Sequence, residues 1–211
     1  MLHAQTVEPA TLELLRLIQS KAYLNNFYLV GGTALALLYG HRKSIDIDLF
    51  TNTDFDTAWL LEHVQHDFPL QVDFVAHNTV KGSINSVKVD IIAHRYPNLA
   101  EPLELNGIRL LSEQDIIAMK LNAISVSGQR SKDFVDIYYA LSRFSVEQML
   151  MFYKKKYSQH NDTHILKSLV FFDDIDLADW PVILDNPNLS WTKVRKRIED
   201  AVLDYMNTYS K

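Results

Sequence analysis

The sequence contains no cysteine, so disulfide bonds and thiolate zinc sites are excluded, and the absence fits a reducing compartment. It contains no apolar run near the ~20 residues that a membrane-spanning helix needs. Its N-terminus also lacks the basic start and following apolar stretch that mark a secretory signal. These absences predict a soluble, cytoplasmic protein with no membrane contact.

Positive charge is also scarce, because 21 Lys and Arg residues face 26 Asp and Glu residues, for a formal net charge of −5. Proteins dedicated to nucleic-acid binding usually carry a basic excess. Any contact with RNA must therefore come from a local patch. Two basic clusters are candidates for such a patch, at residues 154–156 and 193–197. Both patterns are also typical of solvated helix faces.

What is present is an ordinary globular composition, with 47% hydrophobic and 22% charged residues in a chain of 211. Apolar periodicity and turn residues predict an α+β fold with a mixed sheet. Helices are expected over residues 9–24, 33–39, 57–66, 112–125 and 131–144. Strands are expected over residues 27–30, 45–50, 70–77 and 86–93, with a turn at 81–83. We predict a core unit over residues 1–143 and a C-terminal helical extension over 144–211.

The most informative segment begins with Gly31-Gly32-Thr33, which lies between an expected strand and the start of an expected helix. Free backbone N–H groups and the helix dipole favour an anion at such a position. Glycine lets a phosphate approach the backbone closely, and Thr33 adds a hydroxyl donor. We therefore predict phosphate binding at Gly31, Gly32 and Thr33, with Gly40 ending the helix.

Asp46 and Asp48 follow on the next expected strand, where residues i and i+2 face the same side. Ile45, Ile47 and Leu49 would then point into the core. Two neighbouring carboxylates raise each other's pKa, and a hard divalent cation relieves that repulsion. Either motif alone is weak, since it also fits a tight turn or an exposed strand end. Their combination in this order predicts a metal site beside a phosphate site, spaced for one triphosphate.

A third carboxylate is available on the strand over residues 86–93. Asp90 lies on the face opposite three apolar residues, where it would ligate a second metal or accept the proton of an attacking hydroxyl. Asp73 is a competing candidate, and an ordinary polar surface residue is the alternative interpretation.

Charged residues farther along the chain complete the predicted site. Lys120 lies among apolar residues of the expected 112–125 helix, so it either snorkels to water or neutralises the triphosphate. Asp133 suits the start of a helix. Asp136 lies four residues after Lys132, within side-chain reach, so the two form a surface ion pair or contact substrate and orient other groups.

Three residues just before the paired acids have less definite interpretations. Arg42 and Ser44 contact phosphates or shape the loop. His41 has no evident partner and is not expected to be a ligand. Among the aromatic residues after position 144, Trp180 is expected in the core or at an interface.

The segment GGTALALLYGHRKSIDIDLF, residues 31–50, resembles the signature of the AbiEii/AbiGii-type nucleotidyltransferases, toxins of type IV toxin–antitoxin systems. This family belongs to the polymerase-β superfamily, whose pattern is Gly-[Gly/Ser/Thr], a short helix and Asp-x-[Asp/Glu]. The resemblance spans about residues 27–143. It implies a polymerase-β-like core and Mg²⁺-dependent transfer of NMP from an NTP, with Mn²⁺ as the alternative metal. It also implies an acceptor that is RNA, such as a tRNA end, or protein, and a cognate antitoxin.

The resemblance also suggests residue roles. Asp46, Asp48 and Asp90 would bind metal and act in catalysis. Family members carry a lysine in a helix matching that of Lys120, and a K-D-x-x-D-like segment that matches Lys132 and Asp136. These matches favour catalytic or substrate-binding roles over the structural alternatives.

Three other functions compete with this hypothesis. One is a catalytically inactive nucleotidyltransferase fold that binds only a nucleotide or a protein. Another is a DxD glycosyltransferase, which is disfavoured because only 45 residues precede Asp46, too few for several βα units. An aminoglycoside-type nucleotidyltransferase remains a variant of the first hypothesis.

Overall fold

The computed structural model describes residues 2–209 and contains one seven-stranded mixed sheet. The strand order is β3-β4-β5-β2-β1-β7-β6. Strand bounds are β1 (Tyr28–Leu29), β2 (Ile47–Thr51), β3 (Leu70–Ala76), β4 (Thr79–Ile84), β5 (Val87–Ala93), β6 (Leu103–Leu105) and β7 (Ile108–Leu110). This sheet and the helices around it confirm the predicted mixed α/β fold class.

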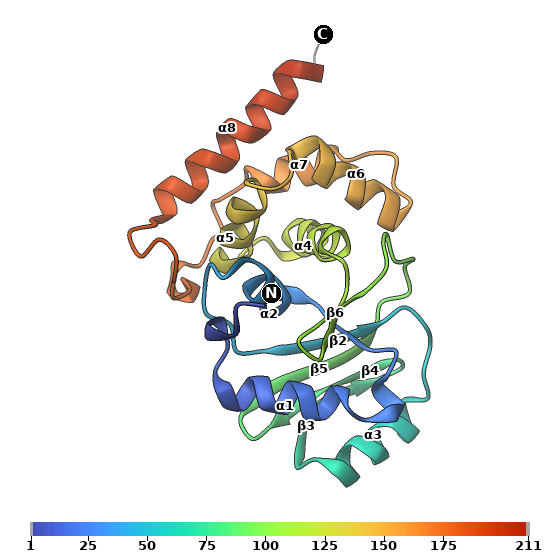
Figure 1. Cartoon of the computed structure of the whole chain (residues 1–211). Helices are drawn as coiled ribbons and strands as arrows, with labels where there is room; N and C mark the ends of the chain where they lie inside the picture. The colour runs from blue at the N-terminus through green and yellow to red at the C-terminus, as the bar shows by residue number, and fades with distance from the viewer. Residues whose placement is uncertain (1, 210–211) are drawn as a thin grey trace.

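Eight α-helices accompany the sheet within the described residues. Their bounds are α1 (Pro9–Gln19), α2 (Gly31–Tyr39), α3 (Thr57–Asp67), α4 (Glu113–Ser127), α5 (Ser131–Ala140), α6 (Val146–Tyr157), α7 (Thr163–Leu169) and α8 (Trp191–Tyr209). Figure 1 shows the sheet with α1 and α3 in one half of the molecule and helices α4 to α8 in the other. Between residues 2 and 209, no helix combines the length and the hydrophobicity needed to cross a bilayer.

The expected helix–strand unit around residues 28–51 forms as the pattern indicates. Helix α2 ends at Gly40, whose left-handed conformation (φ 74°) lets its N–H reach the carbonyl of Ala36. In β2, Ile47 and Leu49 are fully buried, while the alternating residues Asp48 and Phe50 line the cavity beside the helical half. Ile45 differs from the expectation, because the strand begins only at Ile47 and the Ile45 side chain is 63% exposed.

The predicted turn at residues 81–83 is wrong, because these residues lie inside β4. The chain reverses instead at Asn78 and at Asn85-Ser86, all with positive φ. Gly82 marks a close strand contact, since a Cβ there would lie 2.2 Å from the carbonyl oxygen of Gln71 on β3. The short strands β6 and β7 were not predicted, and they extend the sheet beyond β1.

Helices on either side of the proposed 143/144 boundary contact one another. Helices α6 and α7 pack against α4, and α8 packs against α5. The division into two units therefore stays a prediction. Helices α4 and α5 therefore lie between the sheet and helices α6 to α8 (Figure 1), so residues on α4 and α5 can face the sheet.

Candidate active site

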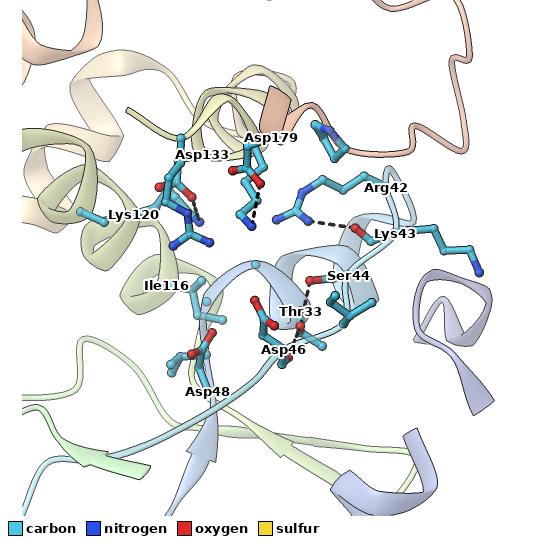
Figure 2. Close-up of a pocket in the computed structure, with 18 of the residues that line it drawn as sticks. Thr33, Arg42, Lys43, Ser44, Asp46, Asp48, Ile116, Lys120, Asp133 and Asp179 are labelled. Atoms are coloured by element: carbon cyan, nitrogen blue, oxygen red, sulfur yellow. Dashed lines mark hydrogen bonds and ion pairs between the residues drawn. The ribbon is translucent and has the colours of Figure 1, made fainter. Parts of the chain in front are cut away.

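A cavity of about 400 Å³ lies between the sheet and the helical half. Figure 2 shows Asp46 and Asp48 on its sheet side, with Lys120, Asp133 and Asp179 opposite them. The cavity brings together nine of the predicted site residues: Gly31, Gly32, Thr33, Arg42, Ser44, Asp46, Asp48, Lys120 and Lys132. Asp90 and Asp136 lie outside its lining.

The glycine pair allows the protein's own charged groups to approach the backbone. A Cβ on Gly31, which has φ +70°, would lie 2.4 Å from an Asp48 carboxylate oxygen. A Cβ on Gly32 would lie 2.3 Å from Nη2 of Arg42. No side chain caps the N-terminus of α2, because Val30 occupies the capping position. The first turn of α2 lines the cavity, and its uncapped N–H groups favour an anion there.

Thr33 fixes the start of β2 relative to α2. Its buried hydroxyl donates to the backbone oxygen of Asp46 and lies 2.9 Å from the Ser44 hydroxyl. Both hydroxyls are thus engaged within the protein and hold Asp46 at the cavity wall. Contact of Thr33 or Ser44 with a nucleotide stays a prediction.

The acids on the sheet side lie on adjacent parallel strands. In the register of β2 and β5, Asp48 is opposite Asp90. Burial, followed by the charges of Asp90 and Asp46, raises the pKa of Asp48 to about 6. Asp90 is buried, and its Oδ1 has no hydrogen-bond partner within the described residues. The competing candidate Asp73 lies on the edge strand β3, two strands away from β5.

The acids on the sheet side are candidate ligands for a divalent metal ion. Within residues 2–209, no group of three acidic or His side chains is arranged to hold a metal ion as it stands. The donor chemistry nevertheless fits a hard cation, since two strand-borne carboxylates repel each other and one buried oxygen lacks a partner. Asp46 supplies a further carboxylate at the same wall.

The raised pKa of Asp48 predicts a stability gain in metal-free Asp48→Asn. The folded chain keeps a proton on Asp48 up to about pH 6, whereas the unfolded chain loses it near the ordinary aspartate pKa of 3.8. Wild-type stability attributable to this group therefore falls as pH rises between these values. At about pH 8, Asp48→Asn should be more stable by at most about 3 kcal/mol, the equivalent of the pKa shift.

Urea denaturation in the presence of a chelator checks this prediction. The difference between wild type and Asp48→Asn should shrink as pH falls through about 4, because Asp48 then becomes protonated in the unfolded chain as well as in the folded one. Asp54→Asn, which changes an exposed acid outside the cavity, provides the control. A variant less stable than wild type at about pH 8 would contradict the cost of burying the charged Asp48 carboxylate beside Asp90 and Asp46.

The opposite wall is organised by Asp136, whose carboxylate is fully buried. It accepts hydrogen bonds from Nε and Nη2 of Arg42 at 2.7 and 2.9 Å, and pairs with Lys120 at 2.9 Å. His41 also lies 2.8 Å from it, so His41 has the partner that the sequence did not reveal. Burial alone would raise the pKa of Asp136, but the charges of Arg42 and Lys120 hold it well below its usual range.

The positions of Lys120 and Lys132 correct two of the alternative interpretations made from the sequence. The interpretation of Lys120 as a snorkelling residue is wrong, because it is only 7% exposed and pairs with Asp133 at 2.7 Å. The surface ion pair that was the alternative interpretation of Lys132 and Asp136 does not form, because Lys132 pairs with Asp179 at 3.1 Å. Asp136 is thereby placed to orient Arg42 and Lys120, and Asp133 does more than begin a helix.

The segment over residues 176–184 forms a wall of the cavity that sequence patterns did not predict. It is attached by two isolated backbone β-bridges, one between Arg42 and Ile183 and one between Arg130 and Asp176. It contributes Asp179 and Trp180 to the lining, and Arg130 lines the cavity beside it. Nothing in the Asp- and Pro-rich sequence indicated its position, because its partners are more than 40 residues away along the chain.

Comparison with known proteins gives a consistent result. The model of the family described as "Nucleotidyl transferase AbiEii toxin, Type IV TA system" matches residues 13–98 and 69–208. A protein of Aquifex aeolicus (strain VF5), the uncharacterized aq_aa25, is 33% identical over 200 residues, covering 92% of this chain and 95% of the relative.

Two solved structures share the fold at 16% identity, each with a TM-score of 0.54. One is an H. pylori protein assigned as a nucleotidyltransferase, with 96% of this chain and 97% of that chain covered. The other is the antibiotic-resistance factor ANT(2'')-Ia, with 71% and 91% covered.

Proposed function

The chain belongs to the AbiEii nucleotidyl transferase family, and we propose that it transfers NMP from an NTP to an acceptor hydroxyl. Family and fold support nucleotidyl transfer in general. The observation that carries the proposal is the shared cavity. An uncapped helix N-terminus, two acids and a wall of cationic side chains all border it.

The triphosphate would lie between the start of α2 and the helical wall. N–H groups near Gly32 favour its negative charge, and Lys132 and Arg130 face the same space. Lys132 becomes available when it releases Asp179, whose side chain is partly exposed. Arg42 and Lys120 are held by Asp136, so they contribute fixed positive charge.

The reaction follows from the acids on the sheet. The acceptor hydroxyl oxygen bonds to the α-phosphorus, the bond to the β-phosphate oxygen breaks, and pyrophosphate leaves toward Gly32 and Lys132. Asp90, which lies opposite Asp48 in the strand register, accepts the hydroxyl proton. Asp46, Asp48 and Asp90 would hold Mg²⁺ or Mn²⁺, which when bound stabilises charge on the attacking and leaving oxygens.

We further propose that the acceptor is RNA, such as a tRNA end, or a protein, and that the chain acts as a toxin with a cognate antitoxin. Support for the toxin role comes from the matching family, which is described as a toxin of type IV toxin–antitoxin systems. The active compartment proposed is the cytoplasm.

An inactive nucleotide-binding module is the second candidate. It is favoured by one observation: Arg42, Lys120 and Lys132 are each paired with a carboxylate, which reduces the positive charge that they offer to a triphosphate. NTP binding by calorimetry without turnover on any acceptor would select this alternative.

Mass spectrometry tests the transfer directly. The full chain, magnesium and each NTP in turn are incubated with total tRNA and with soluble cell protein. The expected result is an acceptor heavier by one NMP in the presence of magnesium and not in the presence of a chelator. The proposal fails if no acceptor gains mass although the NTP binds.

A further inference from the structure

The strand register continues from Asp48 to the edge of the sheet. Asp48 is opposite Asp90, Asp90 is opposite Lys81, and Lys81 is opposite Phe74. Directly paired residues project from the same face of a sheet. With adjacent strands ~4.8 Å apart, these side chains form a row about 14 Å long. One end of this row is the acidic wall of the active-site cavity.

The outer part of the row is open to solvent. Phe74 is 53% exposed, although it is a large aromatic residue. Lys81 and Lys88 lie 3.4 and 3.7 Å from the same Asp90 oxygen, and their side chains are 39% and 56% exposed. Two ammonium groups share this one carboxylate oxygen, so Asp90 neutralises each of them only in part.

The opposite face of these strands is covered. Helix α3 packs against β3 and β4. Val80, which alternates with Lys81 along β4, is buried on that side. The exposed row is therefore a distinct surface that faces away from α3.

The basic clusters suggested by the sequence are largely neutralised. Lys156 is buried against Asp115, and Lys154 pairs with Asp162. On α8, Arg195 and Lys196 each pair with an acid four residues later. The strand row is better placed than these clusters because it leads into the catalytic carboxylates.

We propose that Phe74, Lys81 and Lys88 form the acceptor surface and bind the unpaired 3′ end of a polynucleotide. The inference rests on the proposed function and specifies its acceptor. Phe74 stacks on a base, and the two lysines bind backbone phosphates. The terminal hydroxyl then reaches Asp48 and Asp90 from the side opposite the triphosphate.

The test measures binding of a short single-stranded RNA with a 5′ fluorophore and a free 3′ hydroxyl, without NTP, by fluorescence anisotropy. Phe74→Ala with Lys88→Gln should weaken binding by at least about tenfold, the loss of one stacked base and one phosphate contact. The matched control is Val75→Ala with Lys155→Gln, which removes an exposed apolar residue of β3 and an exposed lysine of α6.

Two further readouts separate this inference from the proposed function. NTP affinity by calorimetry should be equal in wild type and in Phe74→Ala/Lys88→Gln, and the salt dependence of RNA binding should be shallower in that variant. Equal RNA binding by the variant and wild type overturns the acceptor surface. NMP transfer to protein but not RNA also overturns it while leaving nucleotidyl transfer intact. Absence of NTP binding by wild type would instead remove the proposed function.

Discussion

Replacing Asp46 and Asp48 together by alanine should abolish magnesium-dependent incorporation of labelled NTP. The two carboxylates form the acidic wall of the cavity, next to the open N-terminus of α2. Without them, the proposed metal ion would lose its ligands. The charge that builds on the attacking and leaving oxygens would then lose several kcal/mol of stabilisation, so the rate should fall by about 10³-fold or more.

Incorporation of radiolabelled NMP into the acceptor measures this effect. Glu199→Ala with Asp200→Ala is the matched control, since it also removes two acids, both exposed on α8 and outside the cavity. The active-site double variant should remain folded, because it removes a carboxylate whose pKa is raised by burial and then by the neighbouring acids. Labelling at the wild-type rate would show that these acids are not the reaction centre.

The core of the site could be predicted because its signals are local. The order of strand, glycine pair, helix and paired acids is contained within residues 28–51, and alternation alone indicates which strand residues face the core. Asp90 followed from the same alternation on β5. Its position beside Asp48 depends on the parallel pairing of two strands, which the sequence does not encode locally.

The remaining features depend on contacts between distant residues. The hydrogen bond from Arg42 to Asp136 joins residues 94 apart in the chain, so nearby residues such as Lys132 were the only visible partners. The cavity wall at residues 176–184 likewise depends on its bridge to Arg42. At Lys81-Gly82-Ser83, glycine was interpreted as a turn signal, but it serves a close approach between two strands.

The Asp136 network leads to the second large effect. Asp136→Ala should destabilise the protein by about 3–5 kcal/mol, because Arg42 and Lys120 would keep their buried charges without this carboxylate. Asp133→Ala should cost less, since Lys120 would still pair with Asp136. Urea denaturation midpoints measure both changes, and equal stability of Asp136→Ala and wild type would contradict the proposed role.

The pH dependence distinguishes this ionic role from simple packing. The pKa of Asp136 is held well below its usual range, so its stabilisation is present above the unfolded value of about 3.9 and is lost as pH falls through the folded value. Wild type and Asp136→Asn should therefore differ most at neutral pH and converge in acid. Asp136→Asn also serves where the alanine variant does not fold. A positioning role requires that Asp136→Asn weaken NTP binding as well, because Arg42 and Lys120 would lose their fixed orientation at the cavity wall. A difference in stability between wild type and Asp136→Asn that stays constant across the pH range would show that Asp136 acts by packing alone.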